Sequence, residues 1–181
     1  MAFDKIKQND VLSSWYDSFT NQFHSRNVWQ YLEVPEKGCF TDFRKMKVDD
    51  DKLAMERVFS IGGKTGWYYA NFLWKIRGFL DKLIGGVGLR RGRRNQNELE
   101  AGDSVDFWRV LYANKEEKRL LLFAEMKVPG EAWLEFYIKN GELYQEATFR
   151  PLGLSGRLYW YSVLPFHGLI FNGMLRKLAG K

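Results

Sequence analysis

The chain has 181 residues, with 28 Lys and Arg against 22 Asp and Glu, which gives a formal net charge of +6 at pH 7. A chain of this length is expected to form one domain with a substantial core. The single cysteine, Cys39, excludes an intramolecular disulfide and a multi-cysteine zinc site, and two histidines argue against a histidine-rich metal centre. The charged start of the chain shows no secretory signal, so we expect a cytoplasmic protein without metal or cofactor.

Residues 1–34 are predicted to be an N-terminal helical or linker segment. Trp15, Phe19 and Phe23 are spaced by four and would form one apolar stripe on a helix. Pro35 interrupts that pattern. The principal domain is therefore predicted to span residues 35–181.

The first half of this domain is predicted to hold one strand and two helices. Apolar and polar residues alternate over residues 38–48, which is typical of a strand. Residues 49–51 are aspartates that could cap a helix over 52–61, and a second helical pattern follows over 68–84.

The second half is predicted to be a sheet followed by one long helix. Four strand patterns are separated by turn residues and cover 104–113, 119–128, 132–140 and 142–150. The Asn140-Gly141 pair between the last two strands is typical of a two-residue hairpin. Successive strands with short links predict an antiparallel meander, and a helix from about Ser155 completes an α+β order.

The terminal helix contains a long uncharged stretch, residues 158–175. Eighteen residues is the length at which a membrane span must be considered. Polar and helix-breaking residues within it, such as Pro165 and Asn172, favour a buried C-terminal helix instead. Interfacial membrane contact, with residues 159–161 at the headgroup level, is the alternative.

The positive charge is concentrated in one segment. Residues 74–94 hold seven Lys and Arg against one acid, Asp81, so this segment carries +6, the net charge of the whole chain. A solvated loop, an anion site at a cavity mouth and contact with nucleic acid or an anionic membrane are the three interpretations of its arginines. The cluster consists of Arg90, Arg91, Arg93 and Arg94. No recognisable motif supports a nucleic-acid partner.

Three strand acids and one histidine are the candidate catalytic groups: Asp106, Glu125, Glu135 and His167. Outward-pointing acids would belong to the solvent-exposed face of the sheet. Inward-pointing acids would need partners such as Arg109 or His167. Two inward carboxylates would be candidates for proton transfer. His167 lies in the apolar terminal helix, where a core histidine and a ligand contact are both open.

Five stretches of the sequence are distinctive in combination: IGGKTGWYY, LWKIRGFLDKLIGGVGLRRGRR, GDSVDFWRV, AEMKVPGEAWLEF and GRLYWYSVLPFHGLIF. Together they resemble a bacterial family of unknown function in the START and birch-pollen-allergen-like (SRPBCC, polyketide-cyclase-like) superfamily. The resemblance implies a helix-grip fold, in which a curved antiparallel sheet wraps a long C-terminal helix around an apolar cavity. Similar proteins often carry this domain after a Rossmann-type NAD(P)-binding domain, related to atypical short-chain dehydrogenases and epimerases. The 181 residues show no such domain, so two interpretations are open: the C-terminal part of a longer protein and a stand-alone relative.

The leading functional hypothesis is a small-molecule-binding domain whose cavity holds a lipid-, quinone- or polyketide-like ligand. The expected wall residues are aromatic, with the four arginines near the entrance: Trp108, Trp133, Tyr137, Phe149, Trp160 and Tyr161. One alternative is the substrate-binding C-terminal half of an NAD(P)-dependent oxidoreductase or sugar-nucleotide-epimerase-like enzyme, with an NAD(P)-binding domain in cis or in trans. Another is a peripheral membrane-associated domain.

Overall fold

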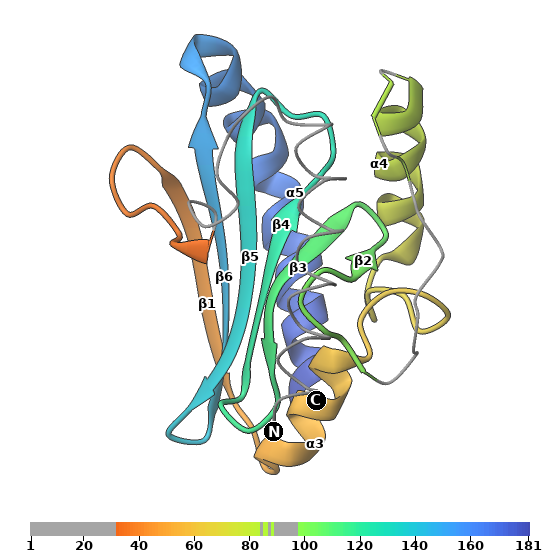
Figure 1. The fold of residues 1–181 in the computed structure, drawn as a ribbon, viewed down its shortest axis with the longest axis vertical. Coiled ribbons are helices and arrows are strands. Elements are labelled where there is room, and N and C mark those ends of the chain that lie inside the picture. The colour runs from red at the N-terminus through yellow and green to blue at the C-terminus, as the bar shows by residue number, and fades with distance from the viewer. Residues whose placement is uncertain (1–31, 84, 87, 89–97) are drawn as a thin grey trace, which may run out of the picture. The chain divides into compact units, whose positions relative to one another are not determined.

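The fold was analysed in a computed structural model that describes residues 32–83, 85–86, 88 and 98–181 (Figure 1). The chain divides after Val34, and the description below concerns the second unit, Pro35–Lys181. The predicted aromatic stripe of the N-terminal segment lies outside the described residues. The cluster of four arginines at positions 90–94 lies outside them as well.

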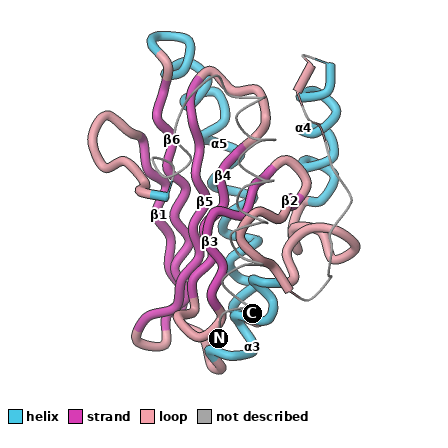
Figure 2. Tube along the Cα trace, in the orientation of Figure 1, coloured by secondary structure: helices cyan, strands magenta, loops and turns pink. Residues whose placement is uncertain are grey.

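Six antiparallel strands form one sheet in the order β1-β6-β5-β4-β3-β2 (Figure 2). The strands are β1 Phe40–Lys47, β2 Ser104–Val105, β3 Trp108–Asn114, β4 Arg119–Ala124, β5 Gly130–Lys139 and β6 Glu142–Pro151. Consecutive strands from β2 to β6 are neighbours, so the predicted meander is confirmed. The early strand β1 joins this meander by pairing with β6.

Local sequence explains the best-defined parts of the sheet. Burial alternates residue by residue along β1, as the alternation of its sequence predicts. Asn140 and Gly141 both have positive φ, 54° and 71°, which a two-residue hairpin turn between β5 and β6 requires.

The segment predicted as one strand over 104–113 consists of two strands. Asp106 has φ of 53°, which turns the chain between β2 and β3. β2 then folds back onto β3, where Val105 pairs with Trp108. The register also shifts between Val110 and Tyr112, so the edge of the sheet is irregular.

In the described part of the chain, the helices beside the sheet are α3 Asp51–Phe59, α4 Asn71–Leu83 and α5 Gly153–Ala179. Asp50 caps α3, because its side chain accepts from the backbone N–H groups of Lys52 and Leu53. α4 begins three residues later than the pattern predicts. Tyr68 and Ala70 have positive φ, 60° and 51°, and this left-handed backbone delays the helix to Asn71.

The long C-terminal helix α5 lies along one face of the sheet and contacts β1, β6 and α3 (Figure 1). Its buried residues include Trp160, Phe171 and Met174, which pack into the domain core. The fold is therefore α+β with a helix-grip arrangement, as predicted. The opposite face of α5 exposes large apolar side chains such as Leu158 and Leu169, so the helix is buried on one side only. No helix in the described part of the chain is both long enough and apolar enough to cross a membrane.

Candidate functional site

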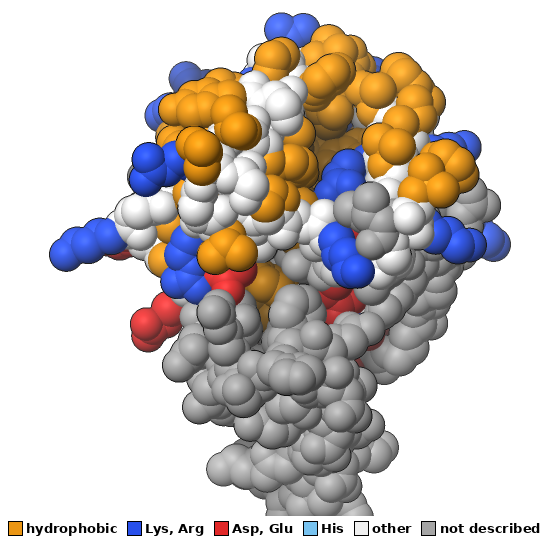
Figure 3. Space-filling model, turned by 90° about the horizontal axis from the view of Figure 1, so that it is seen from above, with side chains coloured by type: hydrophobic (Ala, Val, Ile, Leu, Met, Phe, Trp, Pro, Cys, Tyr) orange, Lys and Arg blue, Asp and Glu red, His pale blue; other side chains and the backbone are white. Residues whose placement is uncertain are grey.

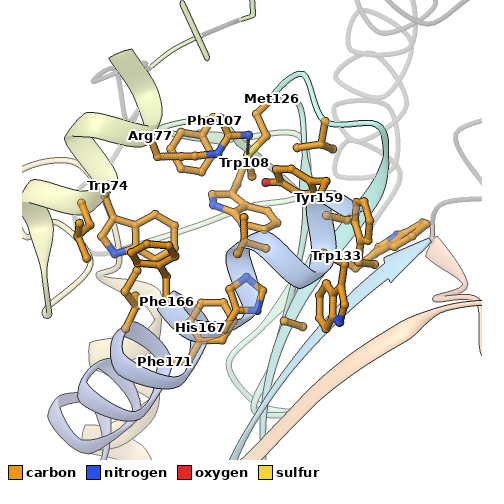
Figure 4. A pocket seen from close by; sticks show the side chains of 18 of the residues that line it. Trp74, Arg77, Phe107, Trp108, Met126, Trp133, Tyr159, Phe166, His167 and Phe171 are labelled. Carbon is orange, nitrogen blue, oxygen red and sulfur yellow. Dashed lines mark hydrogen bonds between the residues drawn. The ribbon is translucent and has the colours of Figure 1, made fainter. Parts of the chain in front are cut away.

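A cavity of about 300 Å³ lies between α4, α5 and the sheet (Figure 4). Its floor includes Ala132 of β5 together with Ala147 and Phe149 of β6. These three residues share one face of the sheet, because Ala132 pairs with Phe149 and Ala147 lies two residues before Phe149. The two alanines leave room beneath the helices that larger side chains would fill.

The α5 wall of the cavity is built from rings spaced along one side of the helix. Trp160 stacks on Phe149 at 5.9 Å between ring centroids, and its other neighbour in this stack is Phe40 of β1, at 5.5 Å. The imidazole of His167 packs edge-on against Trp160, with 5.2 Å between ring centroids, and lies tilted against Phe171 at 4.6 Å. This wall is therefore aromatic, and ring stacking holds it against β1 and β6.

His167 lines the cavity. Its Nδ1 atom is buried and lies 3.7 Å from an Asp42 carboxylate oxygen, too far for a hydrogen bond. Burial lowers the pKa of His167 below its ordinary value, since desolvation disfavours the imidazolium, and the Asp42 carboxylate offsets only part of this effect. The ring therefore faces the cavity as a neutral imidazole at neutral pH.

The α4 wall contributes Trp74 and Arg77, which are one turn apart on the helix. Trp74 stacks on the buried Trp67 at 4.4 Å. The Arg77 guanidinium donates to the Sδ atom of Met126 at 3.0 Å, and a thioether sulfur is a weak acceptor. Figure 4 shows Arg77 reaching from α4 towards Met126.

Two tryptophans at the cavity carry unsatisfied donors. The Nε1 atoms of Trp74 and Trp108 are both buried and have no hydrogen-bond partner. Both side chains are more than nine-tenths buried, with exposed fractions of 8% and 5%. A buried N–H without an acceptor lowers the stability of the fold, so the missing acceptor at each of these two atoms needs an explanation.

The end of α4 is fastened by a buried carboxylate. Asp81 is fully buried and accepts from the backbone N–H groups of Gly88, at 2.9 Å, and Lys127, at 2.7 Å. A Cβ atom on Gly86 would lie 2.3 Å from the Asp81 carboxylate oxygens, so only glycine fits there. The glycine-rich sequence after α4 thus lets the chain close around Asp81.

The two helices that form walls of the cavity also carry exposed apolar side chains. Phe72, Phe79 and Leu83 of α4 are between 62% and 66% exposed, and Phe166 of α5 is 54% exposed. Seen from above, hydrophobic side chains gather on both sides of a hollow, with Lys and Arg around them (Figure 3). Exposed apolar patches on a protein surface often mark a binding site.

Residues 36–174 match the family described as "Protein of unknown function (DUF2867)". The chain belongs to this family. The matched region contains all five stretches that carry the predicted resemblance.

Two further similarities are more limited. Over 129 residues the chain is 30% identical to a probable translation initiation factor IF-2 of Pyrococcus abyssi. The aligned part is 60% of this chain and spans 13% of that relative's length. The crystal structure of Ara h 8.0201 is similar with a TM-score of 0.40 and 10% identity, and the similarity covers 80% of this chain and all of the other.

The structure brings three of the predicted wall residues, Trp108, Phe149 and Trp160, together at the cavity of this DUF2867 domain. Trp133 also borders the cavity, but its position in β5 is one residue from Ala132 and therefore on the opposite face. Its ring packs against Phe123 instead.

The two predicted tyrosines lie away from the cavity lining. Tyr137 stacks on Tyr144 at 4.7 Å, on the face of the sheet opposite the floor of the cavity. Tyr161 is 60% exposed on α5. Neither position could be assigned from sequence, because the phase of a strand or helix depends on which face is covered.

None of the three candidate acids lines the cavity. Asp106 accepts a hydrogen bond from the Trp67 indole at 2.7 Å. Glu125 forms a buried ion pair with Arg109, 2.7 Å between Oε1 and a guanidinium nitrogen, and Glu135 pairs with Arg119 at 2.6 Å. Each carboxylate thus has a structural partner, and only His167 among the candidate catalytic groups reaches the cavity.

Sequence reasoning missed Trp74 and Arg77 as cavity residues. The signal was present in α4, where Leu73, Arg77 and Leu80 are spaced by four and three and so share a face. From the sequence, Arg77 was assigned only to the positive charge of residues 74–94. Within the described residues, no group of three or more His, Cys, Asp or Glu side chains is placed to hold a metal ion.

Proposed function

We propose that this domain binds an apolar or amphipathic small molecule, of lipid-, quinone- or polyketide-like character, in the cavity between α4, α5 and the sheet. The observation that carries this proposal is the lining. It is built almost entirely from aromatic and aliphatic side chains, over a floor kept open by Ala132 and Ala147. Small-molecule sites are typically concave, mostly apolar and equipped with a few polar groups, and about 300 Å³ is within the usual range of volumes.

Burial of apolar surface would supply the binding free energy. Each square ångström of apolar ligand surface removed from water contributes about 25 cal/mol. The rings of Trp108 and Trp160 offer broad flat surfaces for such contact. Arg77 and His167 add polar atoms that could orient a ligand within this apolar setting.

The test is titration with phenylnaphthylamine, a neutral fluorescent probe whose emission rises in apolar sites. We expect saturable one-to-one binding by the wild type and strongly reduced binding by Ala147→Phe, which fills the cavity from its floor. Thr41→Phe adds the same ring at an exposed position of β1 and is the matched control. Equal binding by all three proteins would contradict the proposal, provided that circular dichroism shows each to be folded.

The NAD(P)-dependent alternative has less support in the geometry. Proton transfer in the cavity would depend on His167, since Asp106, Glu125 and Glu135 are engaged elsewhere. We therefore propose that any nicotinamide chemistry belongs to a separate domain, in cis or in trans. Saturable NADPH binding by the present chain would contradict the assignment of nicotinamide chemistry to a separate domain.

A second candidate function is docking on an anionic membrane surface, and the sequence and exposure of the two helices favour it. α5 contains no acid, and the one acid of α4, Asp81, is fully buried. The two helices together carry six basic residues: Lys75, Arg77, Lys82, Arg157, Arg176 and Lys177. Flotation with vesicles of anionic and of zwitterionic lipid tests this candidate, and the anionic vesicles should retain the protein at low salt only.

A further inference from the structure

Three N–H donors without a strong acceptor gather on the α4 side of the cavity. They are the indole Nε1 atoms of Trp74 and Trp108 and the guanidinium of Arg77. We propose that these donors form a binding site for one carboxylate group, so that the ligand is an apolar acid. This inference rests on the proposed function, because it names the chemical class that the cavity would hold.

The three donors are neighbours by several independent contacts. Trp74 and Trp108 both pack against Phe107, at 5.9 and 6.0 Å between ring centroids, and both also contact the ring of Trp67. Arg77 follows Trp74 by one helical turn. Its contact Met126 lies two residues beyond Ala124, which pairs with Trp108 across β3 and β4. Figure 4 shows Trp74, Arg77 and Trp108 on the same side of the cavity.

The charge of Arg77 has no carboxylate partner among the residues that the structure describes. Its single hydrogen bond there goes to the Met126 sulfur. Asp81, one turn further along α4, is engaged by the backbone of Gly88 and Lys127. A guanidinium beside apolar rings is poorly solvated, and a carboxylate forms two parallel, charge-assisted hydrogen bonds with it.

The donors specify the head of the ligand, and the rest of the cavity specifies its tail. Away from α4, the floor at Ala132 and Ala147 and the wall at Trp160 and Phe171 offer hydrocarbon and aromatic surface. His167 is neutral there and adds no second positive charge. One anionic group at one end of an otherwise apolar molecule therefore matches the cavity.

Two fluorescent probes separate the head from the tail. Phenylnaphthylamine and anilinonaphthalene sulfonate share their ring system, and only the second carries an anionic group, which stands in for the carboxylate. The wild type should bind both. Arg77→Met keeps the length of the side chain without its charge, and it should weaken the sulfonate by roughly tenfold or more while changing the neutral probe less than about twofold.

Two further variants control this comparison. Lys75→Met removes one positive charge from an exposed position of the same helix and should leave both probes unchanged. Trp108→Phe removes one indole donor from the site and should also weaken the sulfonate selectively. Equal losses from Lys75→Met and Arg77→Met would mean that only the general positive field matters, and the proposal would be wrong.

Natural head-group chemistry is tested by displacement. Dodecanoate should displace bound phenylnaphthylamine from the wild type at a lower concentration than dodecanol does, and this advantage should vanish in Arg77→Met. Equal displacement by the acid and the alcohol would overturn the carboxylate site while leaving the proposed function intact. Failure of the wild type to bind either probe would instead refute the proposed function itself.

Discussion

The indole Nε1 of Trp67 donates a hydrogen bond of 2.7 Å to the buried carboxylate of Asp106. This bond joins the loop between α3 and α4 to the turn between β2 and β3, 39 residues away in sequence. Trp67 also stacks on Trp74 of α4. One pair of residues therefore fixes the position of a wall of the cavity relative to the sheet.

Substitutions at Asp106 should separate the roles of its acceptor and its backbone. Asp106→Asn keeps an acceptor and tolerates the positive φ, so it should lower the free energy of unfolding by about 1 kcal/mol or less. Asp106→Ala leaves the Trp67 indole unsatisfied and should cost about 2–4 kcal/mol. Urea denaturation measures both values, and similar losses for the two variants would contradict this account.

The buried pair of Glu125 and Arg109 should matter through its geometry. The Glu125 side chain is fully buried and accepts from both Nε and a terminal nitrogen of Arg109. Glu125→Ala removes the carboxylate partner of the partly buried Arg109 guanidinium and should destabilise the domain by about 2–4 kcal/mol. Glu125→Gln retains an acceptor and should cost less. Probe binding by either folded variant should match the wild type, because neither residue lines the cavity.

Two glycines of α5 provide a matched comparison. A Cβ atom on Gly173 would lie 2.4 Å from the ring of Tyr69, whereas one on Gly168 would meet nothing within 4 Å. Gly173→Ala should therefore destabilise the domain by about 1–3 kcal/mol, as overpacking does. Gly168→Ala should be neutral or stabilising by up to about 1 kcal/mol, because alanine favours a helix. Thermal unfolding distinguishes the two, and destabilisation by both would point to a different cause.

Stability should fall in mild acid because of His167. Its pKa is lowered by burial, so the unfolded chain binds a proton at higher pH than the folded one does. The stability linked to neutral His167 is fully present above about pH 6.5 and is lost as pH falls through the folded pKa. His167→Phe should flatten this part of the stability–pH curve. Nuclear magnetic resonance titration of the ring checks the direction of the shift directly.

Local signals in the sequence were sufficient for most of the fold. Alternation predicted β1, aspartates predicted the start of α3, and Asn140-Gly141 predicted the last hairpin. Each depends on neighbouring residues alone. The turn at Asp106 was missed because its positive φ is supported by Trp67, a partner that is distant in sequence.

The site was predicted less completely, for a physical reason. Aromatic content indicated a cavity, and Trp108, Phe149 and Trp160 do line it. Which rings face inward depends on the register of the strands and on the side of a helix that is covered. Tyr137 and Tyr161 lie outside the cavity lining for this reason. The donors on α4 could be recognised only once their missing acceptors were visible.

The way α4 is fastened has a kinetic consequence. Stacking of Trp74 holds the first half of the helix and the carboxylate of Asp81 holds its end, while one side of the helix faces water. Moving a helix that is held by these two contacts should cost less free energy than breaking the hydrogen bonds of a central strand. Amide hydrogens of α4 should therefore exchange before those of β5, and loosening either anchor should shorten the residence time of a ligand more than it slows association.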